Sequence, residues 1–376
     1  MNKNSGKVKI ISLLLGVILF AIGGFFLYGN RGPSTESTSV PSHEEDAMEN
    51  TTDFKNFILL GWDGTQREHL YDLLNAGNLP NLEELIAGGA IVNTIATTGE
   101  TTTKPGWTEI LTGYTPEITG VYSTLDYGPI PKGYTIFERL ESYFGKDNIA
   151  TLFVGGKNNN ITARGQHKVC VNCVRRYQDT FEETNYWQEN TSAPTVTPGE
   201  ERVFEQREGD PYHYTKDALD VYEVALGGAA NVGLTTIDYI EEYKNQRFFA
   251  FFHFEEPDEI GHKYGGGSKE YRDGIITNDY WLGEIVSKLR ESGIYEETLI
   301  YVTSDHGFGE EKKSHRNSPY VFLAANDKDI KKDGDRKDIT PTILNRYGID
   351  IKSITPPLDG ISLIRQTSSG IKNLNQ

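Results

Sequence analysis

Acidic and histidine side chains recur in this sequence just after short apolar runs, which is where enzyme sites often form. These residues are Asp63, Asp258, His262, Asp305, His306 and His315. Three aspartates and three histidines supply the mixed oxygen and nitrogen ligands that hold two divalent metals. Taken singly, each has a plainer interpretation, such as a turn, a helix cap or a solvated surface pair. Their convergence on one edge of a sheet would favour a metal centre.

A hydroxyl residue, Thr103, stands where a nucleophile could act. It precedes Lys104 and Pro105, and a proline favours the start of a helix. Thr103 could simply cap that helix. The same helix start would offer backbone N–H groups to a phosphate, and a hydroxyl beside a divalent metal can attack phosphorus. The sequence therefore leaves a cap and a nucleophile as two interpretations of Thr103.

Alternating strands and helices must position these residues. Apolar runs typical of buried parallel strands alternate with helical patterns such as Ala218–Tyr243 and Lys269–Leu289. The expected strands are Phe57–Gly61, Ile91–Ala96, Ile149–Val154, Arg247–Phe254, Leu299–Thr303 and Tyr320–Ala324. This alternation predicts an α/β fold, a doubly wound, mostly parallel central sheet with helices on both faces. Sites in such folds lie beyond the carboxyl ends of the strands.

One region interrupts the alternation. Residues from about 158 to 215 are polar and rich in aromatic side chains, including Tyr186 and Trp187. A long irregular stretch inside a compact domain indicates a functional insertion or cap. Within it, Cys170 and Cys173 are expected to form a local disulfide if the domain lies outside the cell, with free thiols as the alternative.

Residues 1–30 predict a membrane anchor or a signal segment. Three lysines, the last of them Lys9, precede the uncharged run Ile10–Tyr28. As a helix this run spans about 28 Å, close to the thickness of a bilayer's hydrocarbon core. A retained anchor is favoured over a cleaved signal, because the run is long and no small-x-small cleavage site follows it. The lysines should remain in the cytoplasm, which places the rest of the chain outside, either anchored or secreted.

Composition also divides the chain into parts. Residues 31–53 are expected to be a flexible tether, residues 54–367 the catalytic domain and residues 368–376 a tail.

The charge and cysteine content of the chain exclude some classes of protein. The 376 residues include 37 Lys+Arg and 54 Asp+Glu, a formal net charge of −17. This acidic balance argues against nucleic-acid binding. Two cysteines exclude a disulfide-dense scaffold, and no pattern indicates a protein partner.

Five short motifs occur in order along the chain. They are Leu60-Gly61-Trp62-Asp63-Gly64, Thr103-Lys104-Pro105 with Leu111-Thr112-Gly113-Tyr114-Thr115-Pro116, Pro257-Asp258-Glu259-Ile260-Gly261-His262, Ser304-Asp305-His306-Gly307, and His315 before Pro319. In this order they resemble the alkaline phosphatase superfamily, in its type I phosphodiesterase/nucleotide pyrophosphatase branch. The resemblance covers roughly residues 55–363 and implies an alkaline-phosphatase-like fold.

The resemblance also implies a ligand set and a nucleophile. One metal would be held by Asp258, His262 and His315. The other would be held by Asp63, Asp305 and His306, with the hydroxyl of Thr103 completing it and serving as the catalytic nucleophile. Two divalent ions in such a site clamp the attacking and leaving oxygens. Zinc is the usual ion of the family, and manganese or iron remain alternatives.

The chain departs from the family pattern near the nucleophile. Gly106 stands where family phosphodiesterases often carry Asn, and Thr124 falls near the position of the Asn that binds a phosphoryl oxygen. Thr124 is a differently shaped donor, and it is expected with Lys104 to bind substrate. These departures leave the metal chemistry intact and leave nucleotide specificity open. The segment that follows Thr103 lacks the C/S-x-P-x-R setting of sulfatases, which argues against sulfatase chemistry.

The sequence thus predicts a metal-dependent hydrolase of small-molecule phosphate esters that works through a phospho-threonine intermediate. Phosphodiester or nucleotide pyrophosphate bonds are the expected targets. The alternatives are a phosphomonoesterase or phosphonate hydrolase of the same superfamily, a head-group transferase, and a non-catalytic surface binding protein. Head-group transferases usually carry several membrane helices, whereas this chain has one candidate. A degenerate binding protein should have lost ligands, whereas every ligand position is filled here.

Overall fold

The computed structural model describes residues 54–172, 201–309 and 313–364. The predicted anchor or signal segment, the tether and the tail 368–376 lie outside these residues. None of the helices within the described ranges is long and apolar enough to cross a membrane.

A mixed eight-stranded sheet forms the centre of the domain, in the order β10-β2-β9-β8-β1-β7-β3-β6. Its strands are β1 Asn56–Trp62, β2 Ala90–Ile95, β3 Ala150–Gly155, β6 Val221–Glu223, β7 Phe248–Phe254, β8 Thr298–Thr303, β9 Tyr320–Ala325 and β10 Gly334–Asp335. Strand β9 runs antiparallel to β2 and β8, and the other pairings are parallel. All six strands expected from the sequence are confirmed, whereas the short edge strands β6 and β10 were missed.

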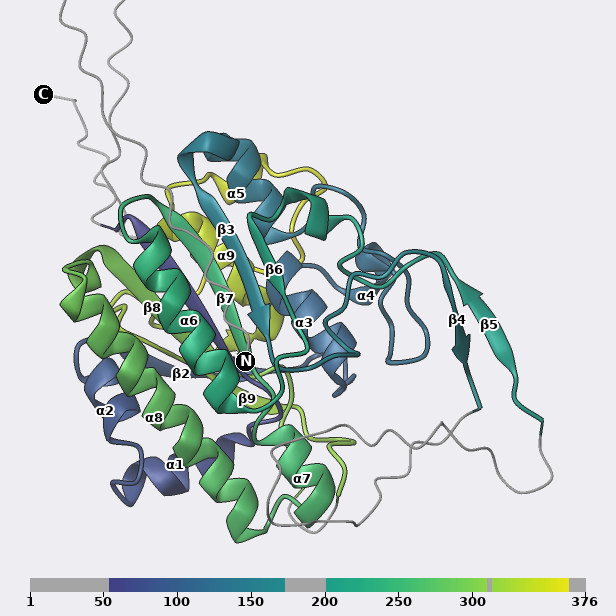
Figure 1. Cartoon of the computed structure of the whole chain (residues 1–376), viewed down its shortest axis with the longest axis horizontal. Helices are drawn as coiled ribbons and strands as arrows, with labels where there is room; N and C mark the ends of the chain where they lie inside the picture. Colours follow the sequence, from purple (N-terminus) through teal and green to yellow (C-terminus); the bar gives the residue numbers. More distant parts are fainter. Residues whose placement is uncertain (1–53, 173–200, 310–312, 365–376) are drawn as a thin grey trace, which may run out of the picture. The chain divides into compact units, whose positions relative to one another are not determined.

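Helices cover both faces of this sheet, which confirms the doubly wound α/β class (Figure 1). The helices are α1 Arg67–Asn75, α2 Pro80–Ala87, α3 Thr103–Thr112, α4 Pro116–Thr119, α5 Ile136–Phe144, α6 Ala229–Tyr243, α7 Asp258–Tyr264, α8 Lys269–Glu291 and α9 Ile339–Arg346. Short 3-10 turns lie at Lys146–Asn148, Thr215–Ala218, Tyr295–Glu297, Arg336–Asp338 and Ile351–Ser353. One layer holds α1, α2, α6 and α8, and the other holds α3, α5 and α9.

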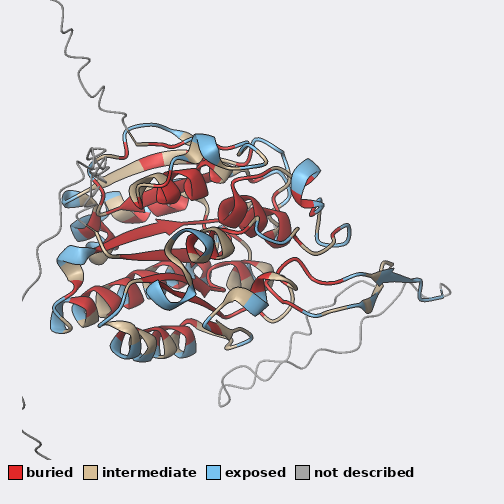
Figure 2. Ribbon diagram, turned by 90° about the horizontal axis from the view of Figure 1, so that it is seen from above, coloured by how far each residue is buried: buried red, intermediate tan, exposed pale blue. Residues whose placement is uncertain are grey.

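The apolar residues of the central strands alternate between the two layers. In β1, Ile58 and Leu60 belong to the core under α6 and α8, whereas Phe57 and Leu59 belong to the core under α3, α5 and α9. Burying each such side chain contributes roughly 1.5–3 kcal/mol. The sheet is accordingly buried on both faces (Figure 2), which makes it a rigid support for the residues at its edge.

One helix prediction was wrong at its start. The sequence predicted a helix over Ala218–Tyr243, but α6 begins at Ala229. Residues Val221–Glu223 instead form β6, which pairs with β3 in parallel. Gly227 then adopts a φ of +75°, a conformation that glycine tolerates and that interrupts a helix. The predicted helix Lys269–Leu289 is confirmed and extends to Glu291.

The structure describes both ends of the predicted insertion. Strands β4 His167–Cys170 and β5 Phe204–Arg207 pair antiparallel in a separate two-stranded sheet. We call these two strands, with the residues that connect them to the main domain, the arm. At its base, the buried carboxylate of Asp210 accepts hydrogen bonds from Thr162 Oγ1 and Arg164 Nε, both at 2.7 Å. Cys170 is disulfide-bonded, and its expected partner Cys173 lies outside the described residues, as do Tyr186 and Trp187.

Candidate metal centre

Residues from four adjacent strands meet at one edge of the sheet, where the strands β8, β1, β7 and β3 end. Asp63 follows β1 and the pair Asp305–His306 follows β8. Asp258 begins α7 after β7, and Lys157 follows β3. The predicted convergence of the acidic and histidine residues is therefore found in the structure, with a lysine added to it.

Two groups of side chains in the described part of the chain can hold a metal ion. Within each group the candidate ligand atoms lie within 4.8 Å of one another. The groups are Asp258, His262 and His315, and Asp63, Asp258 and His306. The first is the set expected from the sequence. The second places Asp258 where Asp305 was expected, so one carboxylate belongs to both groups.

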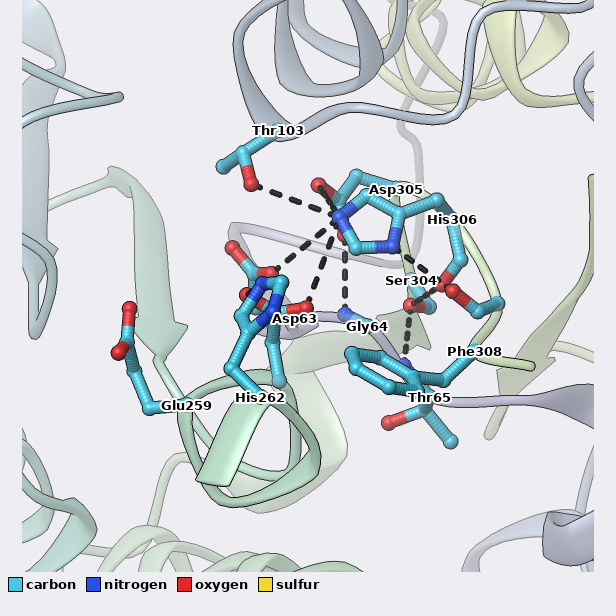
Figure 3. A network of polar contacts seen from close by, with 12 residues as sticks. Asp63, Gly64, Thr65, Thr103, Glu259, His262, Ser304, Asp305, His306 and Phe308 are labelled. Carbon is cyan, nitrogen blue, oxygen red and sulfur yellow. Dashed lines mark hydrogen bonds and ion pairs between the residues drawn. The ribbon is translucent and has the colours of Figure 1, made fainter. Parts of the chain in front are cut away.

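Asp305 nevertheless lies beside the second group. Its Oδ2 atom is 3.3 Å from His306 Nε2, and its Oδ1 atom accepts a hydrogen bond of 3.2 Å from the backbone N–H of Gly64 (Figure 3). Its backbone carbonyl accepts a 2.7 Å hydrogen bond from Nη1 of the buried Arg336, which also donates to Glu109 at 2.6 Å. Since Glu109 lies on α3, Arg336 ties the loop that carries Asp305 to the helix that carries Thr103.

His253 and Trp107 both contact one carboxylate oxygen of Asp63, Oδ2. His253 Nε2 lies 2.7 Å from Asp63 Oδ2, and the indole N–H of Trp107 donates to the same oxygen at 3.2 Å. The other oxygen, Oδ1, lies 3.7 Å from His306 Nε2 and so faces the candidate metal position. Hydrogen bonds of this kind hold metal-binding carboxylates in place in many sites.

Backbone carbonyls set the tautomers of two histidines. His306 Nδ1 lies 2.9 Å from the carbonyl oxygen of Gly307, and His262 Nδ1 lies 3.2 Å from that of Lys313. A carbonyl can only accept, so each Nδ1 carries a proton, which makes Nε2 the ring atom that could bind a metal. Burial, with a smaller effect of His315, lowers the pKa of His306 to about 3, which keeps its ring neutral near pH 7.

Thr103 is the first residue of α3 and is 2 % exposed. The N-cap of α3 is Thr102, and no side-chain hydrogen bond caps the helix. Thr103 Oγ1 instead lies 3.4 Å from His306 Nε2 (Figure 3). It also lies 3.2 Å from Lys157 Nζ. The cap interpretation of Thr103 is therefore wrong, and its hydroxyl faces the candidate metal centre.

Lys157 lies at the middle of the cluster. Its Nζ atom is 2.8 Å from Asp63 Oδ1 and 2.5 Å from Asp258 Oδ2. Burial alone would raise the pKa of both carboxyls, but this ammonium outweighs it, holding the pKa of Asp63 at about 2 and that of Asp258 well below its usual range. Burial and the charge of Asp63 raise the pKa of Asp305 well above its usual range.

The two residues expected to bind substrate differ in burial. Lys104 is buried, and its Nζ atom donates to the carbonyl of Asn159 at 2.9 Å and to Oδ1 of Asn160 at 3.2 Å. Thr124 is exposed on the loop closed by the bridge between Val121 and Tyr127. Within the described residues Thr124 has no hydrogen bond to the metal-ligand cluster, so its role stays a prediction.

The donor set fits divalent metal ions. Asp258 Oδ1, Asp305 Oδ2 and His315 Nδ1 are buried atoms without a hydrogen-bond partner in the part of the chain that is described. Buried polar atoms of this kind are costly unless a ligand satisfies them. Oxygen and imidazole nitrogen atoms together suit zinc and its neighbours in the first transition row.

Sequence reasoning missed Lys157 and His253. Lys157 follows strand β3 at the same sheet edge as Asp63, and its position after a strand was the available signal. His253 is a polar residue inside the run Phe248–Phe254, and its position in an apolar strand was the available signal.

Comparisons with known proteins identify the family of the chain. The model of a family described as type I phosphodiesterase / nucleotide pyrophosphatase matches residues 57–352. A bis(5'-adenosyl)-triphosphatase of Mus musculus is 26% identical over 310 residues, which cover 82% of this chain and 54% of that protein. A 2,3-bisphosphoglycerate-independent phosphoglycerate mutase of Clostridium kluyveri is 28% identical over 133 residues, 32% of this chain and 25% of that protein. The chain thus spans about half the length of the triphosphatase.

Two solved structures confirm the fold class. The phosphonate monoester hydrolase of Agrobacterium radiobacter has a TM-score of 0.52 at 14% identity and covers 82% of this chain and 76% of its own. A protein of the alkaline phosphatase superfamily from Vibrio parahaemolyticus has a TM-score of 0.50 at 15% identity and covers 82% of this chain and 69% of its own. With the family model matching most of the described residues, the chain belongs to the type I phosphodiesterase / nucleotide pyrophosphatase family.

Proposed function

We propose that this chain is a two-metal hydrolase of phosphate esters that uses Thr103 as its nucleophile. The position of the Thr103 hydroxyl carries the proposal. It lies 3.4 Å from His306 Nε2, a ligand atom of one metal-binding group, and that group shares Asp258 with the other. A buried hydroxyl at the start of a helix, beside metal ligands, suits attack on an anionic phosphorus centre.

The residues of the chain would then have separate roles. The Thr103 hydroxyl would lose its proton to solvent as its oxygen bonds to phosphorus and the bond to the leaving-group oxygen breaks. Water would then attack phosphorus, and the Thr103 oxygen would leave and regain a proton. Bound divalent ions would lower the pKa of the hydroxyl and neutralise charge on the phosphate oxygens. Asp258 belongs to both groups and would be available to either ion. The positive end of α3 favours the negatively charged group beside Thr103.

Phosphodiesters and nucleotide pyrophosphates are the proposed substrates. The family membership supports them, and the similar mouse protein is named for its action on a bis(5'-adenosyl) triphosphate. Since this chain spans about half of that protein, the similarity alone does not assign it the same substrate, and dinucleoside triphosphate is a substrate to be tested. Phosphomonoesters and phosphonates remain the second choice within the same chemistry.

The test is hydrolysis by purified protein that begins at Thr51. Bis(p-nitrophenyl) phosphate, p-nitrophenyl phosphate, p-nitrophenyl sulfate and diadenosine triphosphate would be compared at equal concentrations with added zinc or manganese. Turnover of the diester and the triphosphate, with little turnover of the sulfate, is expected. A metal-loaded protein that hydrolyses none of the phosphate esters would refute the proposal and favour a surface binding protein.

Zinc is the proposed ion, at two per chain. The mixed set of carboxylate and imidazole ligands supports zinc, with manganese and iron as the alternatives. Elemental analysis of active protein should find two metal ions per chain, and a chelator should abolish activity that zinc then restores. Active protein with one ion or none would contradict the two-metal arrangement.

We also propose that the catalytic domain lies outside the cytoplasm, anchored by residues 1–30. The run Ile10–Tyr28 behind three lysines supports the anchor, and the disulfide at Cys170 supports an oxidising compartment. Membrane fractionation and N-terminal sequencing test this. Mature chains that begin after residue 28 would replace the anchor with a cleaved signal, and a reduced Cys170 in cells would argue against export.

A further inference from the structure

The side chain of Lys157 is aimed into the site by a rigid part of the fold. Lys157 lies two residues after the end of β3, and its carbonyl accepts a hydrogen bond of 3.2 Å from the N–H of Ala225. The preceding glycines pack too closely for side chains, because a Cβ on Gly155 would lie 2.3 Å from Ile161 and one on Gly156 would lie 2.6 Å from the carbonyl of Gly227. Lys157 is 4 % exposed, so its ammonium has little access to water.

The carboxylate oxygens that this ammonium contacts belong to the residues that would bind metal ions. Its Nζ atom contacts Asp63 Oδ1 and Asp258 Oδ2, at 2.8 and 2.5 Å, and these carboxylates belong to the candidate metal groups. A divalent cation bound to the same oxygens repels the ammonium and competes for the same lone pairs. Lys157 therefore cannot keep both contacts in the metal-loaded protein, and a buried ammonium without partners is costly.

The nearest remaining acceptor position is beside the nucleophile. Lys157 Nζ lies 3.2 Å from Thr103 Oγ1, whereas Glu259 Oε1 is farther away at 4.0 Å. A phosphoryl group attached to Thr103 brings its non-bridging oxygens to this place. Residue 106 is a glycine and has no side chain that could donate a hydrogen bond to the same phosphoryl oxygens. The space for one is also missing, because a Cβ on Gly106 would lie 2.7 Å from Asp305 Cβ.

We propose that Lys157 binds a non-bridging oxygen of the phosphoryl group at Thr103, as a third positive charge beside the two metal ions. The ammonium donates hydrogen bonds and transfers no proton, so the bonds formed and broken at phosphorus are unchanged. A lysine suits this task because it is a compact charge with three donors on a flexible stem. The inference rests on the proposed function, since it places the phosphoryl group at Thr103.

Inorganic phosphate is the probe that tests this inference. The zinc-loaded full chain would be titrated with phosphate by calorimetry, and zinc content would be measured on the same samples. In Lys157→Met the Kd for phosphate should rise about 30-fold or more, as expected for loss of a charged hydrogen bond. Lys157→Arg should restore part of the affinity, and zinc content should not change. In hydrolysis assays the loss should appear in kcat/KM.

A matched control is Lys288→Met. Lys288 is also a paired lysine, 2.7 Å from Glu241 on the surface formed by α6 and α8, and its loss should leave phosphate affinity unchanged. Unchanged phosphate affinity in Lys157→Met would overturn the inference, and so would a lower zinc content, because the weaker phosphate binding would then follow from the missing metal. If Lys157→Met does not fold, Lys157→Gln serves the same comparison. A wild type that binds phosphate through Lys157 but hydrolyses no ester would refute the proposed function alone.

Discussion

Replacing Thr103 with alanine separates catalysis from stability at this site. The hydroxyl of Thr103 contacts His306 Nε2 and Lys157 Nζ and does not cap α3. If it is the nucleophile, Thr103→Ala removes the reacting atom, and losses of roughly 10⁴–10⁶-fold in kcat are typical of such a change. Thr103→Ser keeps the hydroxyl and should retain turnover within about tenfold.

The cost in stability can be worked out from the surroundings of the side chain. Thr103 is 2 % exposed, so the lost methyl group was buried and its removal costs about 1 kcal/mol. The two polar contacts, at 3.4 and 3.2 Å, are long and contribute little. Alanine also favours a helix more than threonine by up to about 0.7 kcal/mol, which offsets part of the loss. The melting temperature should therefore fall by no more than about 4 °C.

The assay compares three proteins, wild type, Thr103→Ala and Thr103→Ser. Release of p-nitrophenol from bis(p-nitrophenyl) phosphate gives kcat, differential scanning fluorimetry gives the melting temperature, and elemental analysis gives the metal content. A brief quench during turnover should trap phosphate on Thr103 in the wild type, detectable by mass spectrometry. Near-normal turnover of Thr103→Ala, with a melting temperature several degrees lower, would refute the assignment of the nucleophile.

Three further predictions concern a residue that orients Asp63, the carboxylate shared by both candidate groups, and a buried carboxylate outside the site. His253→Ala removes the 2.7 Å contact that orients Asp63 and should weaken zinc binding by about 10–100-fold; a chelator competition that shows unchanged affinity would contradict this. Asp258→Asn alters the carboxylate shared by both groups, so elemental analysis should find fewer than two ions per chain, and retention of two ions would argue against sharing. Burial raises the pKa of Asp210, but the hydrogen bond from Arg164 outweighs it, so the pKa lies below the ordinary 3.8. The folded state then binds fewer protons than the unfolded one, and stability is present above about pH 4 and lost as pH falls below it. Asp210→Asn should lower the free energy of unfolding by about 1–3 kcal/mol near pH 7. Its melting temperature should also fall less steeply below about pH 4 than that of the wild type, and an equally steep fall in both proteins would count against this contact.

The central strands were predictable because their local pattern and their environment agree. The run Phe248–Phe254 is apolar almost throughout, as a strand buried on both faces must be. Strand β6 was not predictable in the same way. Its three residues, Val221–Glu223, lie at the sheet edge and depend on pairing with β3, which local sequence does not encode.

The convergence of the candidate ligands was predictable, because these residues follow strands and the carboxyl ends of neighbouring parallel strands lie at one edge of the sheet. The sharing of Asp258 was not, because it depends on how far α7 brings this carboxylate toward His306, a distance set by packing. Lys157 does not belong to a pattern of metal ligands, because an ammonium does not bind a metal ion. Its role as a charged neighbour of Asp63 becomes visible only when β3 and β1 are placed on either side of β7.

Gly106 limits how new specificity can evolve in this protein. A Cβ at this position would lie 2.7 Å from Asp305 Cβ and 3.3 Å from Arg336 Nη1, and both residues are buried and hydrogen-bonded to each other. Any side chain introduced there by a single mutation would push the loop of Asp305 out of place before it could contact a substrate. Selection should therefore reject such variants for lost folding before it can reward them for altered recognition. Natural and laboratory variants with new preferences are expected to carry their changes in the arm that leaves the sheet after Lys157, where residues such as Phe204 are 53% exposed and substitution is cheap.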